Sequence, residues 1–156
     1  MAMREYLKSE GWILVAGEYP GGSDHELYPL NVVDPSVARD NSPDPRRHSL
    51  REIIPDLVAL RGRDLFIGEA KVGYSEKDRD KLDDLVNTRR LDLLGALRTF
   101  ARERNVPAVL PVESLVLRPT LVFRETSEAP KVPAGFSYLR IQNMKQGYFE
   151  GALCQS

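Results

Sequence analysis

The hydrophobic pattern is clearest between residues 53 and 72, where two apolar runs flank a short polar segment. The runs are Ile53–Leu60 and Leu65–Val72, and Arg61-Gly62-Arg63-Asp64 joins them. Branched and aliphatic residues favour strands, and a polar segment with glycine favours a tight turn. The pattern therefore predicts a β-hairpin, around which we expect the rest of the chain to be organised.

The chain before the hairpin predicts one helix, one strand and a long loop. Ala2–Glu10 is predicted to be helical, and Gly11 stands where a glycine commonly terminates a helix. Trp12–Ala16 is wholly apolar, which is typical of a buried strand. From there to the hairpin, glycine, proline and polar residues break every hydrophobic period, so we expect a loop insertion over residues 18–51.

Leucines recur at helical spacing between the hairpin and residue 104. Ser75 is a predicted N-cap, with Asp78 at the capping-box position. We expect Asn87-Thr88 to divide the segment into two helices, with Thr88 capping the second. The residues predicted to form the apolar stripe are Leu82, Leu85, Val86, Leu91, Leu94, Leu97, Phe100 and Ala101. Such a stripe is typical of a core-facing helix, and a subunit interface is the alternative.

The last third of the chain predicts further strands. Ser114–Leu117 and Thr120–Arg124 are predicted strands around Pro119, and a proline within such a run indicates an edge strand or a break. Phe136–Ile141 is the predicted final strand, followed by a short helix at Gln146–Leu153.

The order of these elements predicts an α/β protein of the α+β type, in which a mixed sheet is flanked by helices. At 156 residues, the chain is expected to form a single domain over residues 1–156. The loop at 18–51 would be an insertion in this domain, and residues 125–156 a C-terminal extension.

Composition narrows the class of protein. Acidic and basic residues number 23 and 22, so the chain lacks the basic excess of proteins that bind nucleic acid tightly on their own. A single cysteine, Cys154, fits a reducing compartment, and neither a signal peptide nor an apolar run of membrane-spanning length is present. We therefore expect a cytoplasmic protein with no membrane association. His25 and His48 lack ligand-spaced partners for zinc, and Gly17–Gly22 lacks the lysine of a phosphate-binding loop.

Three ionisable residues fall within the two apolar runs of the predicted hairpin. Glu69 and Lys71 are two positions apart on the second strand and project to one side, while Ala70 points to the other. Asp56 begins the first strand, and the hairpin can bring it opposite Glu69. Two carboxylates suit a hard divalent cation, and an adjacent ammonium suits an anionic reacting group. This set predicts metal-assisted phosphodiester hydrolysis, and the alternative is an exposed cross-strand ion pair.

Pro55-Asp56, followed on the next strand by Glu69-Ala70-Lys71, resembles the signature of the PD-(D/E)xK nucleases. These enzymes share the restriction-endonuclease-like fold, with core order α-β-β-β-α-β, and the elements predicted from residue 2 to 124 follow that order. The resemblance implies a Mg²⁺-dependent endodeoxyribonuclease in which Mn²⁺ can replace Mg²⁺. It further implies that Asp56, Glu69 and the carbonyl of Ala70 hold the metal. Lys71 would then orient the attacking water or stabilise charge on the phosphate.

Relatives of this type often carry a further metal-binding glutamate on the first helix. Glu5 is the best positional match here, with Glu10 as the alternative. The residues expected to contact the DNA backbone are Arg46, Arg47 and His48 at the basic end of the loop, and Lys77 at the start of the following helix. For both groups the alternative is a solvated surface.

The predicted catalytic core takes up most of the chain and leaves little to read a base sequence. We therefore expect DNA as one partner, and either a second copy of the chain or a larger DNA-recognising subunit as another. A restriction endonuclease, or its small cleavage subunit, fits this expectation. The alternatives are a structure-specific repair or junction-resolving nuclease, and a catalytically silent nuclease-like module for DNA binding or interaction.

Overall fold

The predicted hairpin is formed by β4 (Leu57–Arg61) and β5 (Asp64–Ala70) of the computed structural model, which describes residues 2–17, 27–33 and 52–154. Its antiparallel register pairs Leu57 with Gly68 at the open end. At the turn, Gly62 has a φ of +63°, a conformation that glycine adopts without a steric penalty. The hairpin is therefore confirmed, although its first strand begins four residues later than predicted. Of the preceding apolar residues, Ile53 belongs to a separate ribbon of β2 (Val32–Val33) and β3 (Glu52–Ile53).

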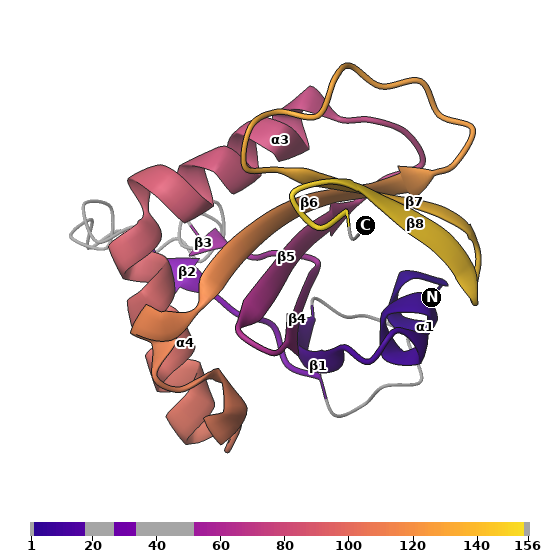
Figure 1. The fold of residues 1–156 in the computed structure, drawn as a ribbon. Helices are drawn as coiled ribbons and strands as arrows, with labels where there is room; N and C mark the ends of the chain where they lie inside the picture. The colour runs from indigo at the N-terminus through magenta and orange to yellow at the C-terminus, as the bar shows by residue number, and fades with distance from the viewer. Residues whose placement is uncertain (1, 18–26, 34–51, 155–156) are drawn as a thin grey trace, which may run out of the picture.

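A six-stranded mixed sheet extends from both sides of this hairpin in the order β1-β4-β5-β6-β7-β8 (Figure 1). The other four strands are β1 (Ile13–Gly17), β6 (Val116–Arg124), β7 (Ser137–Asn143) and β8 (Gln146–Gly151). Strands β5, β6 and β7 run parallel to one another, while β1 and β5 are both antiparallel to β4, and β8 is antiparallel to β7. The parallel β5–β6 pair requires a crossover, which α3 (Glu76–Asp83), a π-helical turn (Asp84–Thr88) and α4 (Arg90–Glu103) provide.

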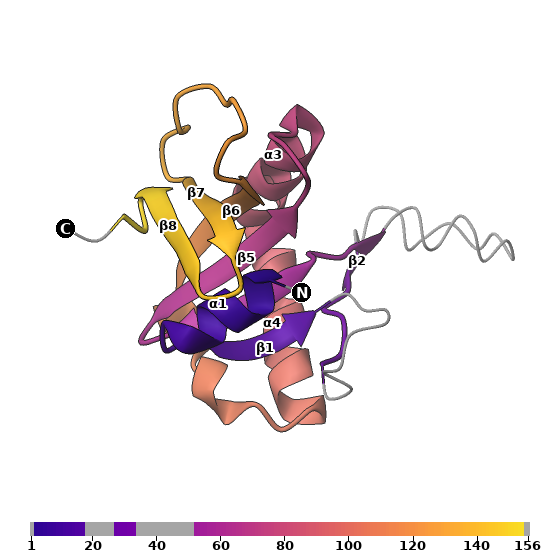
Figure 2. The same cartoon turned by 90° about the vertical axis from the view of Figure 1, so that its right-hand side faces the viewer.

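Helices cover both faces of the sheet, because alternate residues of each strand are apolar on both sides. On β5, Leu65 and Ile67 join the core beneath α3 and α4, whereas Phe66 joins the core on the side of α1 (Ala2–Ser9). Figures 1 and 2 show α1 on one side of the sheet and the α3–α4 pair on the other. The predicted fold class, a mixed sheet flanked by helices, is confirmed. No helix among the described residues has the length and hydropathy that a membrane crossing needs.

Two predictions about burial are wrong. The strand β1 lies at an edge of the sheet, so Ile13 is 57% exposed although the run around it is wholly apolar. Leu91 is 83% exposed and Leu93 is fully buried instead. The cause lies within α4: at about 100° per residue, Leu91 lies roughly 120° from Leu97, outside the buried face of the helix, whereas Leu93 lies within that face. The division of the helix near Asn87-Thr88 is confirmed. The N-cap of the second helix, α4, is Arg89 rather than the predicted Thr88, and its side chain makes no capping hydrogen bond.

The C-terminal third also differs from the prediction. Pro119 does not break β6, because β7 begins to pair with β6 only at Thr120 and the proline lies in the part with a neighbour on one side only. Gln146–Leu153 is not a helix: its first six residues form β8. The edge of β7 offers unpaired backbone groups, and β8 pairs with them from Asn143↔Gln146 to Ser137↔Gly151.

Candidate functional site

The hairpin register brings Asp56 and Glu69 together at one edge of the sheet. Asp56 directly precedes β4, so the Leu57↔Gly68 pairing places it opposite Glu69. The backbone N–H of Ala70 donates a hydrogen bond to Oδ2 of Asp56 over 2.8 Å, which fixes the half-buried carboxylate against the end of β5. Glu69 is only 3% exposed and lies on the same side of β5 as Ile67. Two carboxylates from adjacent strands therefore share one site.

The cation that contacts Glu69 is Lys81 of α3. Its ammonium forms an ion pair with Oε1 of Glu69 and donates a hydrogen bond to the carbonyl oxygen of Ile54 over 3.0 Å. The sequence interpretation missed Lys81, because a lysine beside the buried Leu82 face of a helix usually extends into solvent. The sequence feature that could have pointed to Lys81 is its position about one turn after Asp78, on a helix that packs against β5 and β6.

Burial controls the electrostatics of this pair. Loss of hydration is the main cause that raises the pKa of Glu69 to about 8. A hydrogen bond with Asp56 raises it further, and Lys81 acts in the opposite direction. Because the charged form of Glu69 is disfavoured near neutral pH, a divalent cation that favours this form would displace a proton when it binds.

Lys71, the lysine of the predicted signature, lies elsewhere. The ladder between β5 and β6 slips by one residue after Lys71: the N–H of Arg124 bonds to the carbonyl of Val72 over 3.3 Å, where a regular parallel ladder would use that of Lys71. The side chain of Lys71 is exposed. Within the described residues, no hydrogen bond or ion pair joins its ammonium to Asp56 or Glu69, so Lys81 rather than Lys71 provides the positive charge.

The structure does not bring Glu5 to the carboxylate pair. Its carboxylate is 3.8 Å from the ammonium of Lys8 on the exposed side of α1, and both side chains are more than 40% exposed. The buried residues of α1, among them Tyr6 and Leu7, pack on the sheet face opposite to Glu69. Among the described residues, no three His, Cys, Asp or Glu side chains lie close enough together to hold one metal ion. Asp56 and Glu69 are thus a two-carboxylate site.

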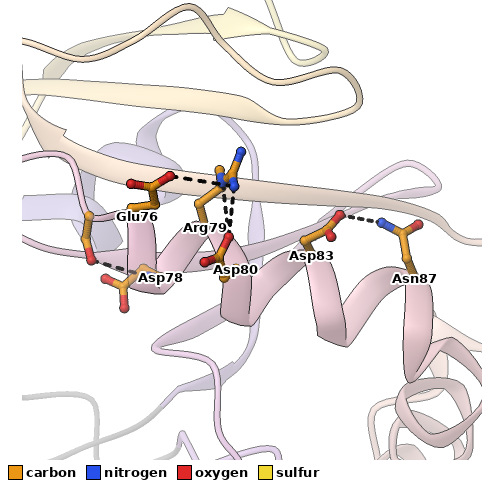
Figure 3. Close-up of polar contacts among 7 residues, drawn as sticks. Glu76, Asp78, Arg79, Asp80, Asp83 and Asn87 are labelled. Carbon is orange, nitrogen blue, oxygen red and sulfur yellow. Dashed lines mark hydrogen bonds and ion pairs between the residues drawn. The ribbon is translucent and has the colours of Figure 1, made fainter.

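The polar side chains of helix α3 form a paired network on its exposed side, apart from the buried acid Asp78 (Figure 3). On the outer side, Arg79 pairs with Glu76 and Asp80. Asp78 points away from this network and is 9% exposed. Its backbone N–H donates a hydrogen bond to the hydroxyl oxygen of Ser75, the N-cap of the helix. Its Oδ2 atom is buried and has no hydrogen-bond partner among the described residues. A buried carboxylate oxygen without a partner is rare in folded proteins and requires an explanation.

A groove of about 580 Å³ opens at the same edge of the sheet, at the C-terminal ends of β5, β6 and β7. Its lining includes apolar residues such as Met3 and Ile141 and the two cationic residues Lys71 and Arg124. Of the other predicted DNA contacts, Lys77 is exposed on α3, while Arg46, Arg47 and His48 lie outside the described residues.

Comparison with known proteins identifies no relative. No family model matches the chain, and no curated protein or solved structure is similar to it at a significant level. The functional interpretation therefore depends on the chain's own residues and their arrangement.

Proposed function

We propose that this protein is a Mg²⁺-dependent endodeoxyribonuclease of the PD-(D/E)xK type. The observation that carries the proposal is the pair formed by the half-buried Asp56, just before β4, and the buried Glu69 of β5, with the ammonium of Lys81 held against Glu69. The order of elements, a helix, three strands of one sheet, a helical crossover and a parallel strand, supports the same family. Few other activities require two carboxylates and an ammonium at the end of a central hairpin.

The residues fit a hard divalent cation. Asp56 and Glu69 offer carboxylate oxygens, the ligands that Mg²⁺ and Mn²⁺ prefer, and the carbonyl of Ala70 is the proposed third ligand. A metal with few protein ligands keeps several water molecules, and when bound it lowers the pKa of one of them and stabilises charge on the phosphate. The low exposure of Glu69 strengthens any electrostatic interaction in the site.

The chain's own side chains have separate tasks in this proposal. Lys81 stabilises negative charge that develops on the reacting phosphate, because it is the lysine that α3 brings to this end of β5. Lys71 and Arg124, which line the groove, bind backbone phosphates of the DNA. Glu5 takes no part, because it lies on the other face of the sheet with Lys8 as its partner.

A near-neutral chain with this small a binding surface needs help to hold DNA. The formal net charge is −1, so affinity for phosphates must come from local basic residues. We propose that a second copy of the chain, or a larger DNA-recognising subunit, provides the remaining contacts, as expected for the cleavage subunit of a restriction endonuclease.

One observation favours a second candidate, a catalytically silent nuclease-like module. The signature lysine, Lys71, is not at Glu69, and Lys81 already neutralises the buried acid. Such a protein would use the groove to bind DNA and would leave the phosphodiester intact.

Nicking of supercoiled plasmid separates the two candidates. The purified chain is incubated with plasmid and roughly 1–10 mM Mg²⁺ or Mn²⁺, both alone and with cell extract. The Asp56→Asn variant is treated in the same way for comparison. The nuclease proposal predicts metal-dependent nicking that Asp56→Asn abolishes. Equal nicking by both proteins would attribute the activity to a contaminant and overturn the proposal. Retention of plasmid on a gel without any nicking, even with extract, would favour the silent module.

A further inference from the structure

Lys81 contacts one buried carboxylate, that of Glu69, and shares helix α3 with another, that of Asp78. Its ammonium pairs with Glu69 and donates to the carbonyl of Ile54. Asp78 stands three residues earlier on the same helix, a spacing at which a carboxylate and an ammonium can pair. Asp78 is 9% exposed and its Oδ2 atom has no hydrogen-bond partner among the described residues, whereas the carboxylate of Glu69 forms an ion pair with Lys81.

The two acids compete for one ammonium. Lysine has a flexible four-carbon stem, so it can exchange partners without movement of the backbone. A divalent cation at Asp56 and Glu69 would repel the ammonium beside Glu69, and Asp78 is the nearest acid along α3 that lacks a partner of its own. The exposed acids of this helix already have partners, since Asp80 pairs with Arg79 and Asp83 accepts from Asn87 (Figure 3).

We propose that Lys81 is a movable counter-charge, which moves from Glu69 to Asp78 when a divalent cation binds at Asp56 and Glu69. This inference rests on the proposed metal-dependent function and adds a control to it. Asp78 is then a positioning residue: it does not contact the metal, but it stabilises the ammonium that the metal displaces. In the metal-bound state the exchange gives Asp78 and the displaced ammonium each other as partners, which avoids the cost of an unpaired charge in the interior.

The proposal makes Asp78 important for metal affinity only while Lys81 is present. If Asp78 were instead a direct metal ligand, its removal would weaken binding whether or not Lys81 is present. If the Lys81–Glu69 pair were fixed, removal of Asp78 would change nothing. A double-mutant cycle distinguishes these cases, because it isolates the dependence of one residue on the other.

The experiment measures Mn²⁺ affinity by the electron paramagnetic resonance signal of free Mn²⁺, without DNA, for wild type, Asp78→Asn, Lys81→Met and the double variant. We expect Asp78→Asn to weaken binding by about tenfold, the effect of losing one hydrogen bond to a charged group. Lys81→Met should tighten binding, and the double variant should match Lys81→Met. Asp80→Asn, an exposed acid of the same helix, is the matched control and should bind like wild type.

Two results would overturn the exchange. One is equal weakening by Asp78→Asn in both backgrounds, which would make Asp78 a ligand, and the other is no effect in either, which would make the ion pair fixed. Absence of Mn²⁺ binding by folded wild type would instead remove the proposed function itself. A second measurement needs no variant that alters folding: in wild type with ¹³C-labelled lysine, the Lys81 side-chain resonance should shift during Mg²⁺ titration, and an unchanged resonance would contradict the proposal.

Discussion

The buried Glu69 makes a specific prediction about stability and pH. Burial holds its pKa at about 8 in the folded state, against an ordinary value of 4.5. The folded protein therefore binds this proton more tightly than the unfolded chain does. The contribution to stability is fully present below about pH 4.5 and is lost as the pH rises through about 8. At about 1.4 kcal/mol for each pH unit, the loss is at most about 5 kcal/mol.

Replacement of the carboxyl by an amide removes this dependence. Glu69→Gln keeps the size of the side chain and cannot ionise, so its free energy of unfolding should fall less than that of wild type between pH 5 and about pH 8. Urea unfolding followed by circular dichroism gives both curves, and Glu5→Gln, an exposed glutamate, should follow wild type. Addition of Mg²⁺ should restore stability to wild type at pH 8 and leave Glu69→Gln unchanged. Parallel curves for wild type and Glu69→Gln would refute a buried, high-pKa acid at this position.

Four other substitutions test separate parts of the structure. Lys81→Met should reduce the cleavage rate by about 10²-fold or more, whereas Lys71→Met should mainly weaken DNA binding. Single-turnover rates at saturating enzyme separate the two effects. A large loss of rate in Lys71→Met and none in Lys81→Met would restore Lys71 as the catalytic lysine. Arg124→Gln should reduce the slope of log affinity against log salt by about one, measured by fluorescence anisotropy with duplex DNA, and an unchanged slope would remove this residue from the DNA surface. Phe66→Ala should lower the free energy of unfolding by about 3–5 kcal/mol, since the ring is fully buried and packs edge-on against Trp12 at 5.8 Å, and a loss below about 1 kcal/mol would contradict that packing.

The hairpin and the pairing of its two acids could be predicted because both depend on local rules. A glycine turn between two apolar runs fixes the register, and the register alone places Asp56 opposite Glu69. The face on which Glu69 lies follows from strand alternation with Leu65 and Ile67. No information from distant parts of the chain is needed for these steps.

The remaining parts of the site depend on tertiary arrangement. Lys81 reaches Glu69 only because α3 packs across β5, and Lys71 loses its expected position because the β5–β6 ladder slips after it. The order of elements along the chain suggests Glu5 as a metal ligand. Which residues Glu5 can contact depends instead on the face of the sheet that α1 covers. The exposure of Leu91 depends on which face of α4 packs against the sheet, since Leu93, Leu94 and Leu97 occupy that face.

The central claim, that Asp56 and Glu69 together hold a divalent cation, can be tested most directly by crystallography with Mn²⁺. Crystals grown near pH 8 and soaked in Mn²⁺ would be measured at a wavelength where manganese scatters anomalously. The proposal predicts an anomalous peak about 2.0–2.3 Å from a carboxylate oxygen of each residue, with the Lys81 ammonium moved away from Glu69. Anomalous peaks at exposed acids alone, with Lys81 still paired to Glu69, would contradict it.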